Sequence, residues 1–218
     1  MRRFCGCGYF LLLLLFVPLL SGAETLHTET VLLDTFDQLQ SAAQGIQSLS
    51  SDFVQEKHLA IFSETLRSKG RFIYRKPDYL RWELLSPVSS GFVLRGQQGE
   101  RWNGLSKETS SFRVDSDPMM GIIARQLFAW AKVDIGWLQS RYRIELVAEQ
   151  PVRLQLFPLD QGESGFIEQL QILFAADNSH VEVVEMYEAG GDKTLLRFVN
   201  VEMNHPLPAE DFKAPEFR

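Results

Sequence analysis

The sequence has almost no cysteine. Of its 218 residues only Cys5 and Cys7 are cysteines, and both lie at the very start of the chain. Residues 8–218 therefore offer no disulfide framework and no thiolate ligands for a metal ion. Any domain in that part of the chain must be stabilised by the packing of its apolar side chains.

Clusters of basic residues and long apolar runs are also missing. The chain has 22 Lys and Arg against 28 Asp and Glu, a formal net charge of −6, so nucleic acid and anionic membrane surfaces are not expected as principal partners. The longest apolar run, Leu11–Leu20, is shorter than the about 20 residues that a membrane-spanning helix needs. We therefore expect a soluble protein, and we expect a monomer.

The apolar run at the start has the flanks of a secretory signal. Arg2 and Arg3 precede it, and Ser21-Gly22-Ala23 places small residues at the −3 and −1 positions of a cleavage site. We predict a signal peptide over residues 1–23, cleaved after Ala23, and a single domain over residues 24–218. No cysteine follows that site to carry a lipid anchor, so the expected destination is the periplasm of a Gram-negative bacterium.

The sequence patterns of catalytic and metal sites are absent. No serine lies in a Gly-x-Ser-x-Gly elbow, and the stretch Gly96–Gly99 lacks the Lys-Ser or Lys-Thr of a phosphate loop, which favours a hairpin turn. The histidines have no metal-ligand spacing and are expected on the surface; they are His27, His58, His180 and His205. We expect no enzymatic activity, no metal and no cofactor.

Two kinds of hydrophobic periodicity divide the chain. Apolar residues at spacings of three and four predict an amphipathic helix from Glu29 to about Ser48. From Leu49 the period changes to two, as in strands. A second helix is predicted from Asp117 to about Lys132, with an acidic cap followed by proline, and a short helical turn from Asp134 to Ser140.

The alternating segments predict a mainly β domain of the α+β class. We expect about ten or eleven strands in an antiparallel meander that curls around its apolar face without closing, with the helices as a lid over the opening. The predicted interior surface and lid consist of Phe72, Tyr74, Leu80, Trp82, Leu84, Phe92 and Leu94 on strands and Met119, Met120, Ile122 and Ile123 on the second helix.

An unclosed barrel offers a concave apolar surface that its own side chains need not fill. The chain has 16 Phe, 4 Trp and 5 Tyr, and such a surface can hold acyl chains without covalent bonds. We expect the second helix to be a mobile lid whose apolar residues face the sheet when the protein is empty and the acyl chains when it is loaded. Leu80 is placed near the rim of this surface, with Arg81 on the opposite face.

Four motifs in the strand region form a recognisable set, completed by the closing segment from Phe198 to Phe212. They are LSSDFVQEK at Leu49–Lys57, GRF at Gly70–Phe72, KPDYLRWE at Lys76–Glu83 and GERW at Gly99–Trp102. The set resembles the LolA family of periplasmic outer-membrane lipoprotein carriers. The resemblance implies an unclosed β-barrel with a helical lid, which receives acylated lipoproteins from an inner-membrane ATP-driven release complex and passes them to an outer-membrane acceptor.

The sequence departs from this family at three places. The family has an arginine immediately before the proline, where it helps to hold the lid closed; here that residue is Lys76, next to Arg75, and lid control is assigned to these two. The aromatic position after the proline is Leu80, and the sequence ends at Phe217-Arg218, whereas the carriers continue further. A LolA-like carrier of another lipid or glycolipid and a lipid-sensing regulator stay open as alternatives, and a lipid-modifying enzyme is the least favoured.

Overall fold

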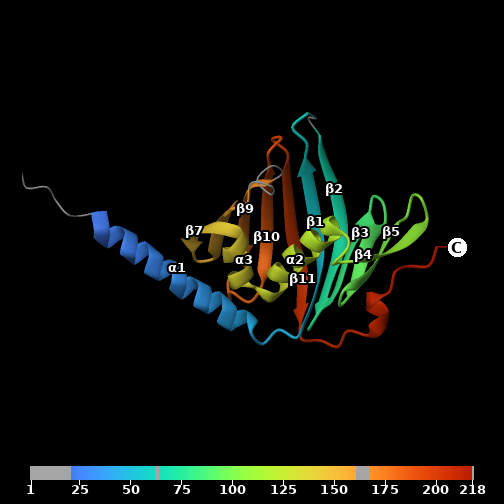
Figure 1. The fold of residues 1–218 in the computed structure, drawn as a ribbon, viewed down its shortest axis with the longest axis horizontal. Helices are drawn as coiled ribbons and strands as arrows, with labels where there is room; N and C mark the ends of the chain where they lie inside the picture. Colours follow the sequence, from blue (N-terminus) through green and yellow to red (C-terminus); the bar gives the residue numbers. More distant parts are fainter. Residues whose placement is uncertain (1–20, 62–63, 161–166, 218) are drawn as a thin grey trace, which may run out of the picture.

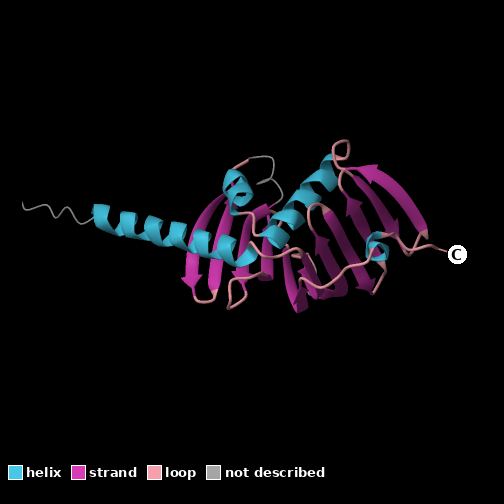
Figure 2. Ribbon diagram, turned by 90° about the horizontal axis from the view of Figure 1, so that it is seen from below, coloured by secondary structure: helices cyan, strands magenta, loops and turns pink. Residues whose placement is uncertain are grey.

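A computed structural model describes residues 21–61, 64–160 and 167–217, with side chains from residue 29 onward. One large antiparallel sheet carries helices on one face (Figures 1 and 2). The strands are β1 (Ser48–His58), β2 (Thr65–Arg75), β3 (Tyr79–Ser86), β4 (Ser90–Arg95), β5 (Gln98–Asn103), β6 (Glu108–Arg113), β7 (Tyr142–Glu149), β8 (Val152–Pro158), β9 (Ile167–Phe174), β10 (Val181–Glu188) and β11 (Lys193–Met203). The helices are α1 (Ser21–Ala43), α2 (Pro118–Lys132), α3 (Ile135–Arg141) and the 3₁₀ segment η1 (Ala209–Phe212).

The sheet consists of two meanders joined at their first and last strands. Its strand order is β6-β5-β4-β3-β2-β1-β11-β10-β9-β8-β7, and β1 pairs along its length with β2 on one side and with β11 on the other. In the described part of the chain the end strands β6 and β7 do not pair with each other. The predicted unclosed, eleven-stranded antiparallel sheet with a helical cover is therefore confirmed.

This topology determines where α2 lies. Strands β6 and β7 follow each other in the sequence, but they stand at opposite edges of the sheet. The chain between them must cross one face of the sheet, and Figure 2 shows α2 and α3 on that face. We call it the concave face, and the opposite one the convex face.

The predicted boundaries of α2 and α3 are confirmed by their caps. Asp117 accepts a hydrogen bond from the backbone N–H of Met120 at 3.1 Å, and Pro118 occupies the first turn of α2. Val133 ends α2 in the left-handed conformation, and its N–H is directed at the last carbonyl oxygens of the helix. Asp134 then caps α3 through the N–H of Trp137 at 3.0 Å.

The prediction for the first helix is wrong at both ends. The helix runs from Ser21 to Ala43, whereas Glu29 to about Ser48 was expected. Ser48 instead begins β1, where it pairs with Arg75 of β2. The predicted signal peptide falls mostly on residues 1–20, which lie outside the described residues.

Aromatic side chains pack tightly on the concave face. Phe53 of β1 stacks on Trp82 of β3, with ring centroids 4.0 Å apart, although β2 lies between the two strands. The ring crosses Gly70 of β2, where an added Cβ would lie 2.1 Å from the Phe53 ring and 2.4 Å from the Glu83 carbonyl oxygen. Gly70 is therefore required here for close approach, not for an unusual backbone angle.

The convex face has a small core of its own. Ile73 of β2 is fully buried there against Leu207 and Phe212, with Tyr79 packed beside them. These contacts hold the C-terminal segment, residues 204–217, against the outside of β2 and β3. The α-helices therefore lie on one face of the sheet, and part of the other face is covered by the C-terminal segment, which includes η1.

Candidate lipid-binding site

The space between α2 and the sheet is apolar and almost completely filled. It forms a cavity of about 20 Å³, lined by Leu49, Ser51, Phe72, Leu127, Trp130, Ala131, His180, Val181, Phe198 and Val201. A volume of this size holds about one water molecule. An acyl chain can therefore enter this space only if α2 moves away from the sheet.

The predicted strand residues all lie on the concave face. Phe72, Trp82 and Phe92 are direct cross-strand partners on β2, β3 and β4, and Tyr74, Leu80 and Leu94 form a second such row. Direct partners in an antiparallel ladder project from the same face of the sheet. The structure thus brings these side chains together, although of this set only Phe72 lines the cavity.

The placement of Leu80 near the rim is wrong. Its side chain is 0% exposed, in a packed row with Tyr74 and Leu94. Exposure instead increases along β3 in the direction of the chain, and Trp82 and Leu84 are partly exposed. The open end of the concave face is therefore near Leu84.

The expected orientation of the α2 side chains is also partly wrong. Met120 is buried, but Met119 is 62% exposed, Ile122 43% and Ile123 37%. Small residues, including Ala124, occupy much of the buried face, which lets the helix backbone approach the sheet. Helix α2 consequently carries apolar side chains toward the sheet and toward solvent, and contact of the exposed three with lipid stays a prediction.

Two polar contacts hold α2 in place, and sequence reasoning missed both. The Arg101 guanidinium on β5 donates to the carboxylate of Asp117 at 3.2 Å, and the Tyr142 hydroxyl on β7 donates to the Gln126 side-chain oxygen at 2.8 Å. Arg101 lies in the GERW motif and points to the same face as its partner Phe92, so alternation could have identified it. No sequence signal places Tyr142 beside Gln126.

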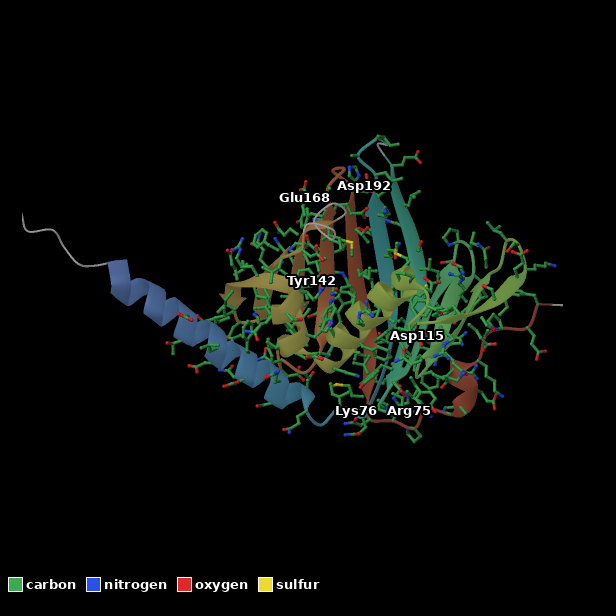
Figure 3. The ribbon with its side chains drawn as sticks, in the orientation of Figure 1. Arg75, Lys76, Asp115, Tyr142, Glu168 and Asp192 are labelled. Carbon is green, nitrogen blue, oxygen red and sulfur yellow. The ribbon has the colours of Figure 1, made fainter. Side chains whose placement is uncertain are left out.

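The hydrogen bonds of Arg75 and Lys76 go to other segments than α2, although Gln44, the partner of Lys76, borders the C-terminal end of α2 at Lys132 and Val133, and lid control by these two residues stays a prediction. Arg75 projects to the convex face, where it donates to the Leu207 carbonyl oxygen at 2.7 Å and lies over the rings of Tyr79 and Phe212. The Lys76 ammonium donates to the Gln44 carbonyl oxygen at 3.3 Å. Figure 3 places both residues at one end of the sheet, close to the C-terminal segment.

Two polar side chains in the cavity wall are buried and unpaired. Among the described residues the Ser51 hydroxyl and the Trp130 indole N–H have no hydrogen-bond partner. His180, which also lines the cavity, has its Nδ1 2.8 Å from the Ser179 hydroxyl. Burial lowers the pKa of His180, while the carboxylates of Asp177 and Glu182 act in the opposite direction.

The expectation that every histidine lies free on the surface is wrong for two of them. His180 is partly buried in the cavity wall, and His205 is partly buried beside Ser48 and Ser50. His58 is exposed, as expected. The side chain of His27 lies outside the described residues.

Neither membrane-spanning helices nor metal-ligand clusters are found among the described residues. None of the helices within residues 21–61, 64–160 and 167–217 is long and apolar enough to cross a membrane. In the same ranges no cluster of three or more His, Cys, Asp or Glu residues could hold a metal ion.

Comparison of the sequence with known families and proteins gives a consistent set of matches. The family model described as outer membrane lipoprotein carrier protein LolA matches residues 44–215. An outer-membrane lipoprotein carrier protein of Cupriavidus taiwanensis is 26% identical over 189 residues, which cover 81% of this chain and 82% of that protein. A protein of the same description from Pseudoalteromonas translucida is 18% identical over 184 residues, covering 83% and 82%.

Solved structures share the fold at lower sequence identity. An uncharacterized conserved protein from Thermus thermophilus superposes with a TM-score of 0.53 at 11% identity, covering 85% of this chain and 95% of that one. MucB superposes with a TM-score of 0.52 at 17% identity, covering 85% of this chain and 63% of MucB. At these identities the likeness extends to the fold alone.

Proposed function

The chain belongs to the LolA family of outer-membrane lipoprotein carriers, which are non-enzymatic periplasmic transport proteins, and on this basis we propose that it binds the acyl chains of lipoproteins between α2 and the concave face of its sheet. It then carries them from the inner to the outer membrane. The observation that carries this proposal is an apolar face covered by a separate helix that is itself apolar on both sides.

The energy of acyl transfer supports a division of labour with membrane partners. At about 0.8 kcal/mol per buried methylene, three long acyl chains are held in a bilayer by ~30 kcal/mol. A soluble carrier cannot extract such cargo unaided. The proposal therefore includes an ATP-driven release complex in the inner membrane that supplies the cargo and an outer-membrane acceptor that receives it. Cleavage of a signal peptide after Ala23, which would release the carrier into the periplasm, is part of the same proposal. A monomeric state of the carrier is also part of it.

Helix α2 gives the carrier moderate affinity. Loading requires α2 to leave the sheet, because the cavity of about 20 Å³ has no room for an acyl chain. The contacts that α2 loses are replaced by contacts with the acyl chains, so part of the binding free energy is used to open the protein. Cargo bound in this way can be released to an acceptor that binds it more tightly.

Native mass spectrometry of the protein purified from its own periplasm tests the proposal. We expect a co-purifying acylated polypeptide, and in vitro a synthetic triacylated lipopeptide should bind with one-to-one stoichiometry. A glycolipid mass in its place would favour the carrier of another lipid. If neither the triacylated lipopeptide nor a glycolipid bound at micromolar concentration, acyl-chain transport would be contradicted.

A further inference from the structure

The cavity under α2 has one unpaired hydrogen-bond donor in each of two opposing walls. Ser51 projects from β1 on the sheet side and is 3% exposed, while Trp130 projects from α2 and is 6% exposed. Both residues line the cavity, and neither the Ser51 hydroxyl nor the Trp130 N–H has a partner among the described residues. A buried donor without a partner costs about 1–3 kcal/mol, so an atom that accepts hydrogen bonds would be favoured in the space that both residues line.

The neighbouring serines of β1 show that Ser51 is a special case. The Ser48 hydroxyl donates to the His205 carbonyl oxygen at 2.8 Å, and the Ser50 hydroxyl lies 3.4 Å from His205 Nε2. These two serines anchor the chain that follows β11. Ser51 projects from the other face of β1 beside its cross-strand partner Phe72, where its hydroxyl has no such structural task.

The third polar residue of the cavity, His180, indicates that the ligand atom is uncharged. The Ser179 hydroxyl donates to Asp177 at 2.7 Å, so it accepts the Nδ1 proton of His180 and leaves Nε2 unprotonated. Burial lowers the pKa of His180 and thereby disfavours its cationic form. Among the described residues no basic side chain other than this histidine lines the cavity, so a carboxylate or phosphate would lack a counter-charge from them. A neutral carbonyl oxygen, in contrast, has two lone pairs for two donors.

We propose that Ser51 and Trp130 bind the carbonyl oxygen of an acyl ester or amide, the group that joins an acyl chain to its headgroup. This inference rests on the proposed function, because it requires acyl chains to enter between α2 and the sheet, with α2 displaced far enough for one carbonyl oxygen to lie between Trp130 and Ser51. A buried ester carbonyl without a donor would oppose binding. The pair removes that penalty and fixes the depth to which an acyl chain enters.

Matched uncharged ligands test the inference in the purified protein. Methyl dodecanoate and dodecyl methyl ether differ only in the carbonyl oxygen, and each is titrated against bound N-phenyl-1-naphthylamine, an uncharged apolar fluorophore. The parent protein should bind the ester about three- to tenfold more tightly than the ether. Ser51→Ala should reduce this ratio by about threefold, and Ser51→Ala with Trp130→Phe should bring it close to one.

Ser50→Ala is the matched control, since it removes a hydroxyl one residue away on the other face of β1 and should leave the ratio unchanged. Ser51→Ala should have a Tm at least as high as the parent, because an unpaired hydroxyl is replaced by a methyl group. If the ratio of ester affinity to ether affinity is the same in the parent and in both Ser51 variants, this inference is overturned and the proposed function is unaffected. If neither ligand displaces the fluorophore, the proposed function itself fails.

A second arm identifies the source of the carbonyl. A triacylated lipopeptide and a phosphatidylglycerol are compared for their affinities to the parent and to Ser51→Ala by native mass spectrometry. Loss of affinity for the lipopeptide alone assigns the site to lipoproteins, and loss for phosphatidylglycerol alone assigns it to glycerolipids. Equal loss for both supports recognition of the shared carbonyl, whereas no loss for either contradicts it.

Discussion

At the scale of single residues, Gly70 is a position in the sheet that has no room for a side chain. The Phe53 ring lies across it to reach Trp82. We expect Gly70→Ala to lower the free energy of unfolding by about 1–3 kcal/mol, because the methyl group would overlap the ring and the Glu83 backbone. Urea denaturation measures the change. Gly45→Ala is the control, since an added Cβ there meets nothing within 4 Å; an equal loss in both variants would refute the steric explanation.

Leu80 and Leu84 provide a second residue-scale prediction, because they project from the same face of β3 with different burial. Leu80→Glu should lower the free energy of unfolding by about 3 kcal/mol or more, since its carboxylate would be buried without a partner. Leu84→Glu should be folded with a near-parental Tm but should bind acyl ligands more weakly. Thermal melts and fluorophore displacement measure the two effects.

The prediction that Leu80 is packed core and Leu84 lies at the mouth of the site would be contradicted by a stable Leu80→Glu protein with weakened acyl binding. That result would place the mouth at Leu80. Arg81→Glu, on the opposite face of β3, is unsuitable as a control. Arg81 pairs with Glu83 at 2.7 Å and donates to the carbonyl oxygens of Asp211 and Lys213, so its replacement would detach the C-terminal segment.

His180 makes the stability depend on pH. Its pKa in the folded protein is lowered by burial below the about 6.5 of an unfolded chain, so the unfolded state binds protons first as the pH falls. The contribution of His180 to stability is therefore complete above pH 6.5 and decreases below it. We expect the Tm advantage of the parent over His180→Gln to be smaller at pH 5.5 than at pH 7.5. His58→Gln, at an exposed position, should show no such change. If the Tm difference between the parent and His180→Gln grew on acidification, the lowered pKa of His180 would be disproved.

At the scale of elements, α2 is held by apolar packing together with the contacts of Arg101 and Tyr142. An exposed ion pair contributes up to about 1 kcal/mol. Arg101→Ala should therefore speed hydrogen exchange over residues 118–132 by about two- to fivefold in the empty protein and leave residues 80–84 of β3 unchanged. Exchange measured by mass spectrometry distinguishes the two segments, and acyl loading should alter exchange in α2.

Arg113→Ala is the matched control for this experiment. Arg113 also pairs with an aspartate on an exposed surface, but its partner, Asp115, lies outside α2. The proposed lid motion would be refuted if α2 and β3 exchanged equally slowly and neither responded to acyl ligands.

At the scale of the whole molecule, the order of the strands creates the site. Pairing of β1 with β11 joins two meanders and leaves β6 and β7 at the outer edges (Figure 1). The connection between those edges has to cross the concave face. In the described part of the chain this cover takes no part in the backbone ladder of the sheet. A sheet closed on itself would have no need of such a crossing.

Much of the architecture follows from local sequence signals. Alternation with period two predicts the strands, and it places Phe72, Trp82 and Phe92 on one face because successive side chains of a strand point to opposite sides. The limits of α2 follow from Asp117 and Pro118, which act on the backbone within one turn. These features could be predicted because their causes lie within a few residues along the chain.

Only the tertiary structure decides which side chains meet across the sheet and which stay accessible. Leu80 and Leu84 have the same periodicity, but only Leu80 is fully buried. Arg75 reaches Leu207 across 132 positions of sequence, and Ser51 and Trp130 line one cavity only because the crossing helix α2 covers β1. Strand pairing fixes each of these juxtapositions between distant segments, and a local pattern carries no information about partners so far along the chain.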